Sequence, residues 1–132
     1  MIEAKLSISR IEKMLREAVK TVYTGEVFYH NRKALSEQKL SDFMVVKVNG
    51  QVSGIIATDE IIAGDSFVLV QLWAKDRVGE KNVNKLIEMR DLLMSIIPYK
   101  TEDYKITYKG EVGSRDSIGF HSEFINLTLQ IF

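Results

Sequence analysis

The chain of 132 residues contains no cysteine, and this absence narrows its chemistry. Disulfides, thiolate metal sites and a cysteine nucleophile are all excluded. Histidine is scarce too, with only His30 and His121. These two could in principle bind a metal with Asp42 or Asp116, but no close ligand spacing such as His-Glu-x-x-His occurs. We therefore expect no metal and no cofactor.

Neither sign of charge dominates, since 18 Lys and Arg residues balance 18 Asp and Glu residues. Coating nucleic acid requires a basic excess to neutralise phosphates, so we expect no direct sequence-specific nucleic-acid binding. No apolar run approaches the ~18 residues that span a membrane. Charged residues also interrupt the N-terminus, which leaves no signal-peptide core. The chain is expected to stay in the compartment where it is made, away from membranes.

What is present is ordinary for a globular domain: 45% hydrophobic and 27% charged residues. The length suits one domain with a sizeable core, and no repeat, linker or low-complexity segment divides it. The sequence predicts a single α+β domain covering residues 1–132.

The stretch from Ser66 to Pro98 organises this domain. Residues 67–74 are apolar apart from Gln71, which predicts a central strand covered on both faces. Residues 80–97 then show helical spacing, and Pro98 ends the helix. The apolar residues of this helix are expected to form one buried stripe: Val83, Leu86, Ile87, Leu93, Ile96 and Ile97.

The first half of the chain predicts a helix followed by strands. An amphipathic helix starts at Ser7 or Ser9, where Ser9 and Glu12 match a capping box, and it ends at Thr24-Gly25. A short strand at 26–30 and a polar loop at 31–41 follow. Residues 42–48 and 51–57 then read as a hairpin, because the Asn-Gly dipeptide between them tolerates positive φ.

The second half closes the sheet. Residues 103–109 alternate as a half-exposed strand, with Tyr104 and Tyr108 on the side of Ile106 that faces the core. Residues 110–119 are expected to be a long flexible loop, and residues 124–132 the last strand. Together the elements predict a mostly antiparallel sheet of about five to six strands with two main helices packed on it.

No arrangement of residues predicts catalysis. The glycine-rich segment 110–116 lacks the Gly-Lys-Ser/Thr ending and the following helix of a phosphate-binding loop. No Gly-x-Ser-x-Gly turn exposes a nucleophile. An enzyme using His30 or His121 as acid or base remains an alternative, and it requires a deep pocket that holds a histidine beside a carboxylate. We expect a protein that is not an enzyme.

The order of elements nevertheless resembles a known family. The N-terminal helix leads to Val27-Phe-Tyr-His30, a polar loop and the strand Asp42-Phe-Met-Val-Val-Lys-Val48. The strand ending Val70-Gln-Leu-Trp-Ala74 runs into a Leu-Ile-x-x-Arg-x-Leu-Leu helix, and Gly119-Phe-His121 precedes the last strand. From residue 8 to the end, the chain resembles the tail-completion and tail-terminator proteins of long-tailed bacteriophages, neck components that prophages also encode.

This resemblance implies a structural protein that caps the tail tube and joins it to the head connector. It implies assembly into a homo-oligomeric ring, commonly a hexamer, with the tail tube protein and head-connector proteins as partners. The protein would lie in the host cytoplasm during assembly and then in the virion. The alternative is a small bacterial protein–protein interaction module unrelated to phage, with a stable monomer and a discrete partner groove.

By position, three loops are the candidate contact segments: residues 31–41, 58–65 and 110–119. Their charges could pair between neighbouring subunits, and such peripheral pairs give orientation more than affinity. The candidate subunit or tail-tube contacts are Arg32, Lys33, Asp59, Glu60, Glu111, Arg115 and Asp116.

Overall fold

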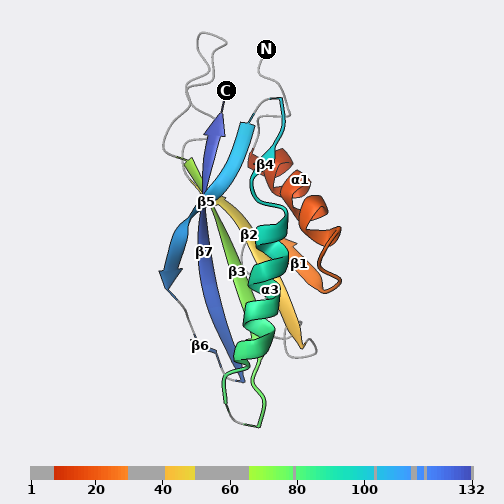
Figure 1. Ribbon diagram of the computed structural model, residues 1–132, viewed down its shortest axis with the longest axis vertical. Helices are drawn as coiled ribbons and strands as arrows, with labels where there is room; N and C mark the ends of the chain where they lie inside the picture. The colour runs from red at the N-terminus through yellow and green to blue at the C-terminus, as the bar shows by residue number, and fades with distance from the viewer. Residues whose placement is uncertain are drawn as a thin grey trace.

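The computed structural model describes residues 8–29, 41–49, 66–78, 80–102, 104–113, 116–117 and 119–131. The elements are α1 (Ile8–Lys20), β1 (Glu26–Tyr29), β2 (Asp42–Asn49), β3 (Ser66–Lys75), α3 (Val83–Ser95), β4 (Tyr99–Lys100), β5 (Tyr104–Gly113), β6 (Asp116–Ser117) and β7 (Phe120–Ile131). The strands form one sheet against which both described helices pack, so the predicted α+β fold is confirmed (Figure 1). Neither of these helices is long and apolar enough to cross a membrane.

The sheet has the strand order β1-β2-β3-β7-β5-β4, and the short β6 pairs with β7. Every pairing is antiparallel except the parallel pair β1–β2. β3 lies in the middle of the sheet, as predicted. It pairs with β2 along the whole of that strand, from Asp42↔Ala74 to Asn49↔Phe67. The strand predicted at 51–57, which was expected to pair with β2, lies outside the described residues.

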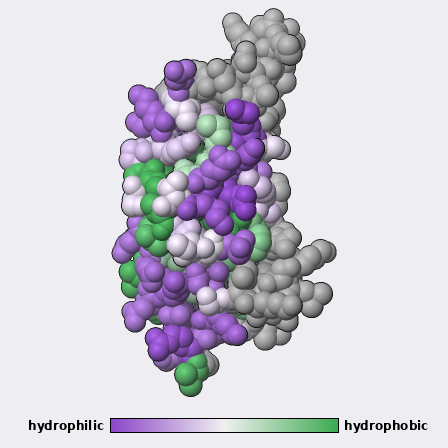
Figure 2. Space-filling view, turned by 90° about the vertical axis from the view of Figure 1, so that its right-hand side faces the viewer, coloured by the Kyte–Doolittle hydropathy of each residue, from purple (hydrophilic) through white to green (hydrophobic). Residues whose placement is uncertain are grey.

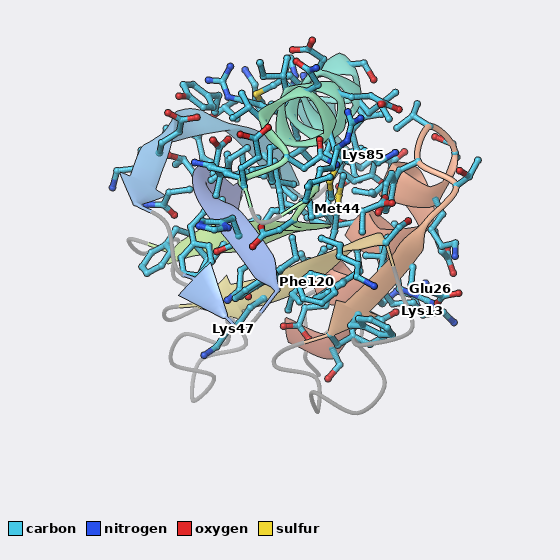
Figure 3. The ribbon with its side chains drawn as sticks, turned by 90° about the horizontal axis from the view of Figure 1, so that it is seen from below. Lys13, Glu26, Met44, Lys47, Lys85 and Phe120 are labelled. Carbon is cyan, nitrogen blue, oxygen red and sulfur yellow. The ribbon has the colours of Figure 1, made fainter. Side chains whose placement is uncertain are left out.

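The main core lies between the helices and one face of the sheet. Along β3, Val68, Val70 and Leu72 alternate toward this face and are fully buried, as a strand period of two requires. Figure 3 shows Met44 of β2 between the sheet and the helices. The helices contribute Ile11, Leu15 and Val19 from α1, and Leu86, Met89 and Leu93 from α3.

The opposite face of the sheet carries a second, aromatic cluster. Phe43 is buried there, and its ring stacks on that of Trp73 with centroids 5.9 Å apart and planes 7° apart. The rings of Phe28 and Phe120 also pack against Phe43, each with its centroid 5.8 Å from that of Phe43. On this face Trp73 and Phe67 are only partly buried. The prediction that the central strand is covered on both faces is therefore confirmed on the helix side, whereas on the opposite face the strand is only partly covered apart from the buried Gln71.

The prediction of a long loop at residues 110–119 is wrong. Residues 110–113 extend β5, residues 116–117 form β6, and β7 begins already at Phe120. β5 continues through its glycines because its register against β7 shifts between Tyr108 and Gly110 and again between Glu111 and Gly113. Such bulges insert an extra residue without ending a strand, and Gly113 has a φ of 117°, which glycine adopts easily.

Three predictions on the helices also need correction. Val83 and Ile87, expected in the buried stripe of α3, are 49% and 51% exposed. Ile96 and Ile97 lie beyond the end of α3 and are partly buried. Ser9 lies within α1, and the carboxylate of Glu12 accepts a hydrogen bond from the backbone N–H of Val48 on β2 at 2.9 Å. Glu12 thus fixes α1 to the sheet.

Candidate functional site

Glu111 is the one candidate contact residue whose side chain the structure describes. It extends from β5 and forms an ion pair with Arg90 of α3, whose Nε lies 3.0 Å from Glu111 Oε1. Arg90 also donates a hydrogen bond from Nη2 to the hydroxyl of Tyr108 at 3.3 Å, and its guanidinium lies 5.8 Å from the centre of that ring. The hydrogen bond to Tyr108 is the main cause that raises the pKa of Arg90. Glu111 therefore has a partner within its own chain.

Of the other candidate contact residues, Asp116 alone lies within the described part of the chain. Asp116 belongs to β6 and pairs through its backbone with His121 of β7. It is therefore part of the sheet and not of a free loop. The remaining candidates lie outside the described residues: Arg32, Lys33, Asp59, Glu60 and Arg115.

Asp42 joins both helices to the start of β2. One of its carboxylate oxygens accepts a short hydrogen bond from the hydroxyl of Tyr23, directly after α1. The other oxygen accepts a hydrogen bond from Ser41 Oγ at 2.6 Å and lies 3.8 Å from the ammonium of Lys85 on α3. Burial, and next the bond to Asp42, raise the pKa of the Tyr23 phenol. Figure 3 shows Lys85 reaching down from α3. With its partners already supplied by the chain, Asp42 acts as a structural tie.

Gly25 allows this arrangement, because a Cβ at this position would clash with the phenol ring of Tyr23. α1 already ends at Lys20, so Gly25 does not end the helix as predicted but permits a close approach of this side chain to the backbone.

His121 lies beside a carboxylate. Its Nδ1 is 2.6 Å from Oδ1 of Asp76, and the backbone N–H of Asp76 donates to the carbonyl of Gly119 at 2.8 Å. Asp76 borders a polar pocket of about 370 Å³ together with Lys75, Arg77 and Lys85. His121 is not among the residues that line it. The pair thus meets one requirement of the acid–base alternative, a histidine beside a carboxylate, without placing that histidine in the pocket.

No metal centre forms in the described part of the chain, because no three His, Asp or Glu side chains there come together. Asp42, one of the possible metal ligands named above, instead accepts hydrogen bonds from the hydroxyls of Tyr23 and Ser41. His30, the other histidine considered as a ligand, lies outside the described residues.

Two surface features lie at the two ends of α3. The first is the turn Arg77–Glu80, which joins β3 to α3 and carries Val78 at its tip. The second is a groove of about 450 Å³ between the C-terminal end of α3 and β5. Met94, Ile97 and Tyr108 line the groove, and Arg90 and Lys105 lie on its rim.

A sequence signal existed for part of this surface. Tyr108 was expected to face the core with Tyr104, since both alternate with Ile106. Tyr104 is buried, but Tyr108 is 44% exposed, because it lies farther along β5 where it faces the groove. The single proline and the isoleucine before it marked the end of the helix, and the same two residues line the groove.

Comparison with known proteins adds no identification, since no protein-family model matches the chain and neither does any curated protein sequence.

Proposed function

We propose that the protein is a structural neck component of a long-tailed phage or prophage, which caps the tail tube and joins it to the head connector by ring assembly without catalysis. The observation that supports this proposal most is the agreement in fold. The resemblance implies a sheet with helices against it, and α1 and α3 both pack on one face of a curled sheet (Figure 1).

Two of the elements that carry the resemblance occupy central places in the fold. The strand ending Val70-Gln-Leu-Trp-Ala74 is β3, and Gly119-Phe-His121 opens β7, its antiparallel neighbour. These two strands form the centre of the sheet, whereas Val27-Phe-Tyr belongs to the edge strand β1. The resemblance thus rests in part on the core of the domain.

The alternative function is a bacterial interaction module with a single foreign partner. The groove between α3 and β5 favours it to the extent that such a module requires a discrete docking surface. The two functions differ in what the protein assembles with. A neck component joins copies of itself on a tail tube, whereas the module stays monomeric.

The test is to measure the solution mass over a wide protein concentration range at low and moderate salt, with negative-stain images of the same samples. The purified protein is then mixed with tail tubes. A ring with a central hole, or a cap on the tube end, is the expected result. A monomer at all concentrations that also leaves the tubes uncapped would rule out the neck function and leave the interaction module.

A further inference from the structure

The turn between β3 and α3 is strained in an unusual way. Arg77 and Glu80 are joined by two backbone hydrogen bonds of 2.9 Å each. Val78, which follows Arg77, has a φ of +47°. Positive φ favours asparagine, aspartate or glycine, whereas a β-branched side chain at positive φ is a genuine outlier.

Nothing within the described fold compensates for this strain. The Val78 side chain is fully exposed, at 103% of its reference area, and therefore contributes nothing to the core. Figure 2 shows hydrophobic surface at the lower tip of the molecule, where Figure 1 places this turn. An apolar side chain held in a strained, fully exposed position points to a contact outside the fold.

The groove beside the other end of α3 has a lining that suits an apolar side chain. Met94, Ile97, Pro98 and Tyr108 give it an apolar lining, and its volume of about 450 Å³ exceeds that of a valine side chain. The turn precedes the N-terminus of α3 and the groove lies at its C-terminal end, so the two features occupy opposite ends of one helix. One copy cannot fill its own groove with its own turn.

One charge on the turn also matches the groove. Arg77 and Glu80, both exposed, flank Val78 on the turn. The charged residues that line the groove, Arg90 and Lys105, are both basic. A turn entering the groove can therefore place the carboxylate of Glu80 near Lys105, with unlike charges facing each other.

From these observations, we infer that the Val78 turn of one copy docks in the α3–β5 groove of a second copy. Such a contact joins two different surfaces of the same chain, and it therefore repeats from copy to copy, giving a ring where the rotation between copies closes and an open filament where it does not. The inference deepens the neck function proposed above, on which it rests, by naming the surfaces through which subunits join.

Val78→Asn is the most informative variant, because asparagine suits a residue with positive φ. We expect a variant that folds at least as stably as the wild type and whose self-association is about tenfold to a hundredfold weaker, as loss of one buried aliphatic side chain predicts. Ile87→Gln is the matched control, since it removes an exposed apolar side chain of α3 outside the turn and the groove. Equal self-association of Val78→Asn and wild type in sedimentation experiments would overturn the inference.

Mixing two variants tests the head-to-tail geometry. Met94→Glu places a charge in the groove but leaves the turn intact, whereas Val78→Asn does the reverse. Each variant alone is expected to be monomeric, and a mixture is expected to form dimers that extend no further. Circular dichroism checks that Met94→Glu is folded. A folded pair that gives no dimer on mixing contradicts the geometry.

Because the natural chain has no cysteine, engineered thiols report the contact directly. A mixture of Glu80→Cys and Lys105→Cys copies is expected to form a disulfide-linked dimer under mild oxidation, and neither variant alone is expected to do so to the same extent. Failure to cross-link at the highest concentration, with the wild type monomeric, overturns the inference. Rings or tube caps that form equally well from Val78→Asn would overturn it but leave the neck function standing. Cross-linked assemblies that never cap a tail tube would support the contact between copies but overturn the neck function.

Discussion

The two helices lie on the same face of the sheet but use their apolar residues differently. On α1, Ile11, Leu15 and Val19 all point into the core and are fully buried. Its polar residues also bind the sheet, because Arg16 Nε donates to the carbonyl of Val27 at 2.8 Å and Glu12 accepts from Val48. α1 is therefore fixed by its own chain on several turns.

On α3, the apolar residues divide between inside and outside. Leu86, Met89 and Leu93 are fully buried, whereas Val83 and Ile87 are half exposed. Scattered exposed apolar residues are ordinary on a protein surface. The comparison therefore teaches that α3 contributes one face to the core and keeps Val83 and Ile87 on an outer face that also carries polar residues, whereas the apolar residues of α1 whose burial is described are buried or partly buried.

The largest expected effect tests this division directly. Leu15→Ala in α1 and Leu93→Ala in α3 each remove a fully buried side chain and leave a cavity, so we expect each to lower the free energy of unfolding by ~2–5 kcal/mol. Ile87→Ala is expected to change it by less than about 0.5 kcal/mol, because alanine also has the highest helix propensity. Urea unfolding measures all three. A loss for Ile87→Ala as large as that for Leu93→Ala would show that the outer face of α3 is needed within the fold.

A second prediction concerns Tyr23, which follows α1 and binds Asp42 at the point that Lys85 of α3 also reaches. Burial and the bond to Asp42 raise the pKa of Tyr23 in the folded state, whereas the unfolded phenol titrates near its ordinary value of about 10. The contribution of Tyr23 to the free energy of unfolding is thus fully present below about pH 10. Above that pH the unfolded state loses the proton first, and stability falls by up to ~1.4 kcal/mol per pH unit.

Urea titrations between neutral and high pH measure this dependence. Tyr23→Phe is expected to be less stable at neutral pH and to lose the part of the alkaline decline that Tyr23 causes. Tyr108→Phe is the control, because it removes an exposed phenol and leaves Tyr23 in place. Equal alkaline slopes for Tyr23→Phe and the wild type would show that Tyr23 titrates in the folded protein much as it does in the unfolded chain.

How much the sequence predicted also differs between these helices. The helical period predicted α1 well, because its apolar stripe faces one sheet: Ile11, Leu15 and Val19 are buried, and Met14 and Ala18 beside them are partly buried. On α3 the apolar residues surround more of the helix, so periodicity could not separate Leu86 and Leu93 from Val83 and Ile87. Only the position of the sheet decides which of them are buried.

The candidate contacts were harder still to predict. Glycines at 110 and 113 are typical of loops, yet both pair with β7 directly after a register shift, and β5 continues along β7. The pair of Arg90 and Glu111 joins residues distant in sequence, and the pair of His121 and Asp76 depends on the register of β3 against β7. Such juxtapositions arise from tertiary pairing, for which local pattern gives no signal. The strain at Val78 could not be predicted from the sequence either, because only the backbone angle φ shows it.

The smallest expected effect concerns the outward polar contact of α3. The side chains of Arg90 and Glu111 are 36% and 48% exposed, so water and salt screen their ion pair. A double-mutant cycle with Arg90→Met and Glu111→Gln is therefore expected to give a coupling of ~0.2–1 kcal/mol that shrinks at high salt. On α1, by contrast, the bond between Glu12 and Val48 is buried, and salt has little access to it. A weak Arg90–Glu111 coupling means that breaking this ion pair costs little, so that each residue is able to pair with a residue of another molecule instead. A coupling above about 2 kcal/mol that persists in salt would instead mean that the outer face of α3 is as firmly committed to its own fold as the inner face of α1.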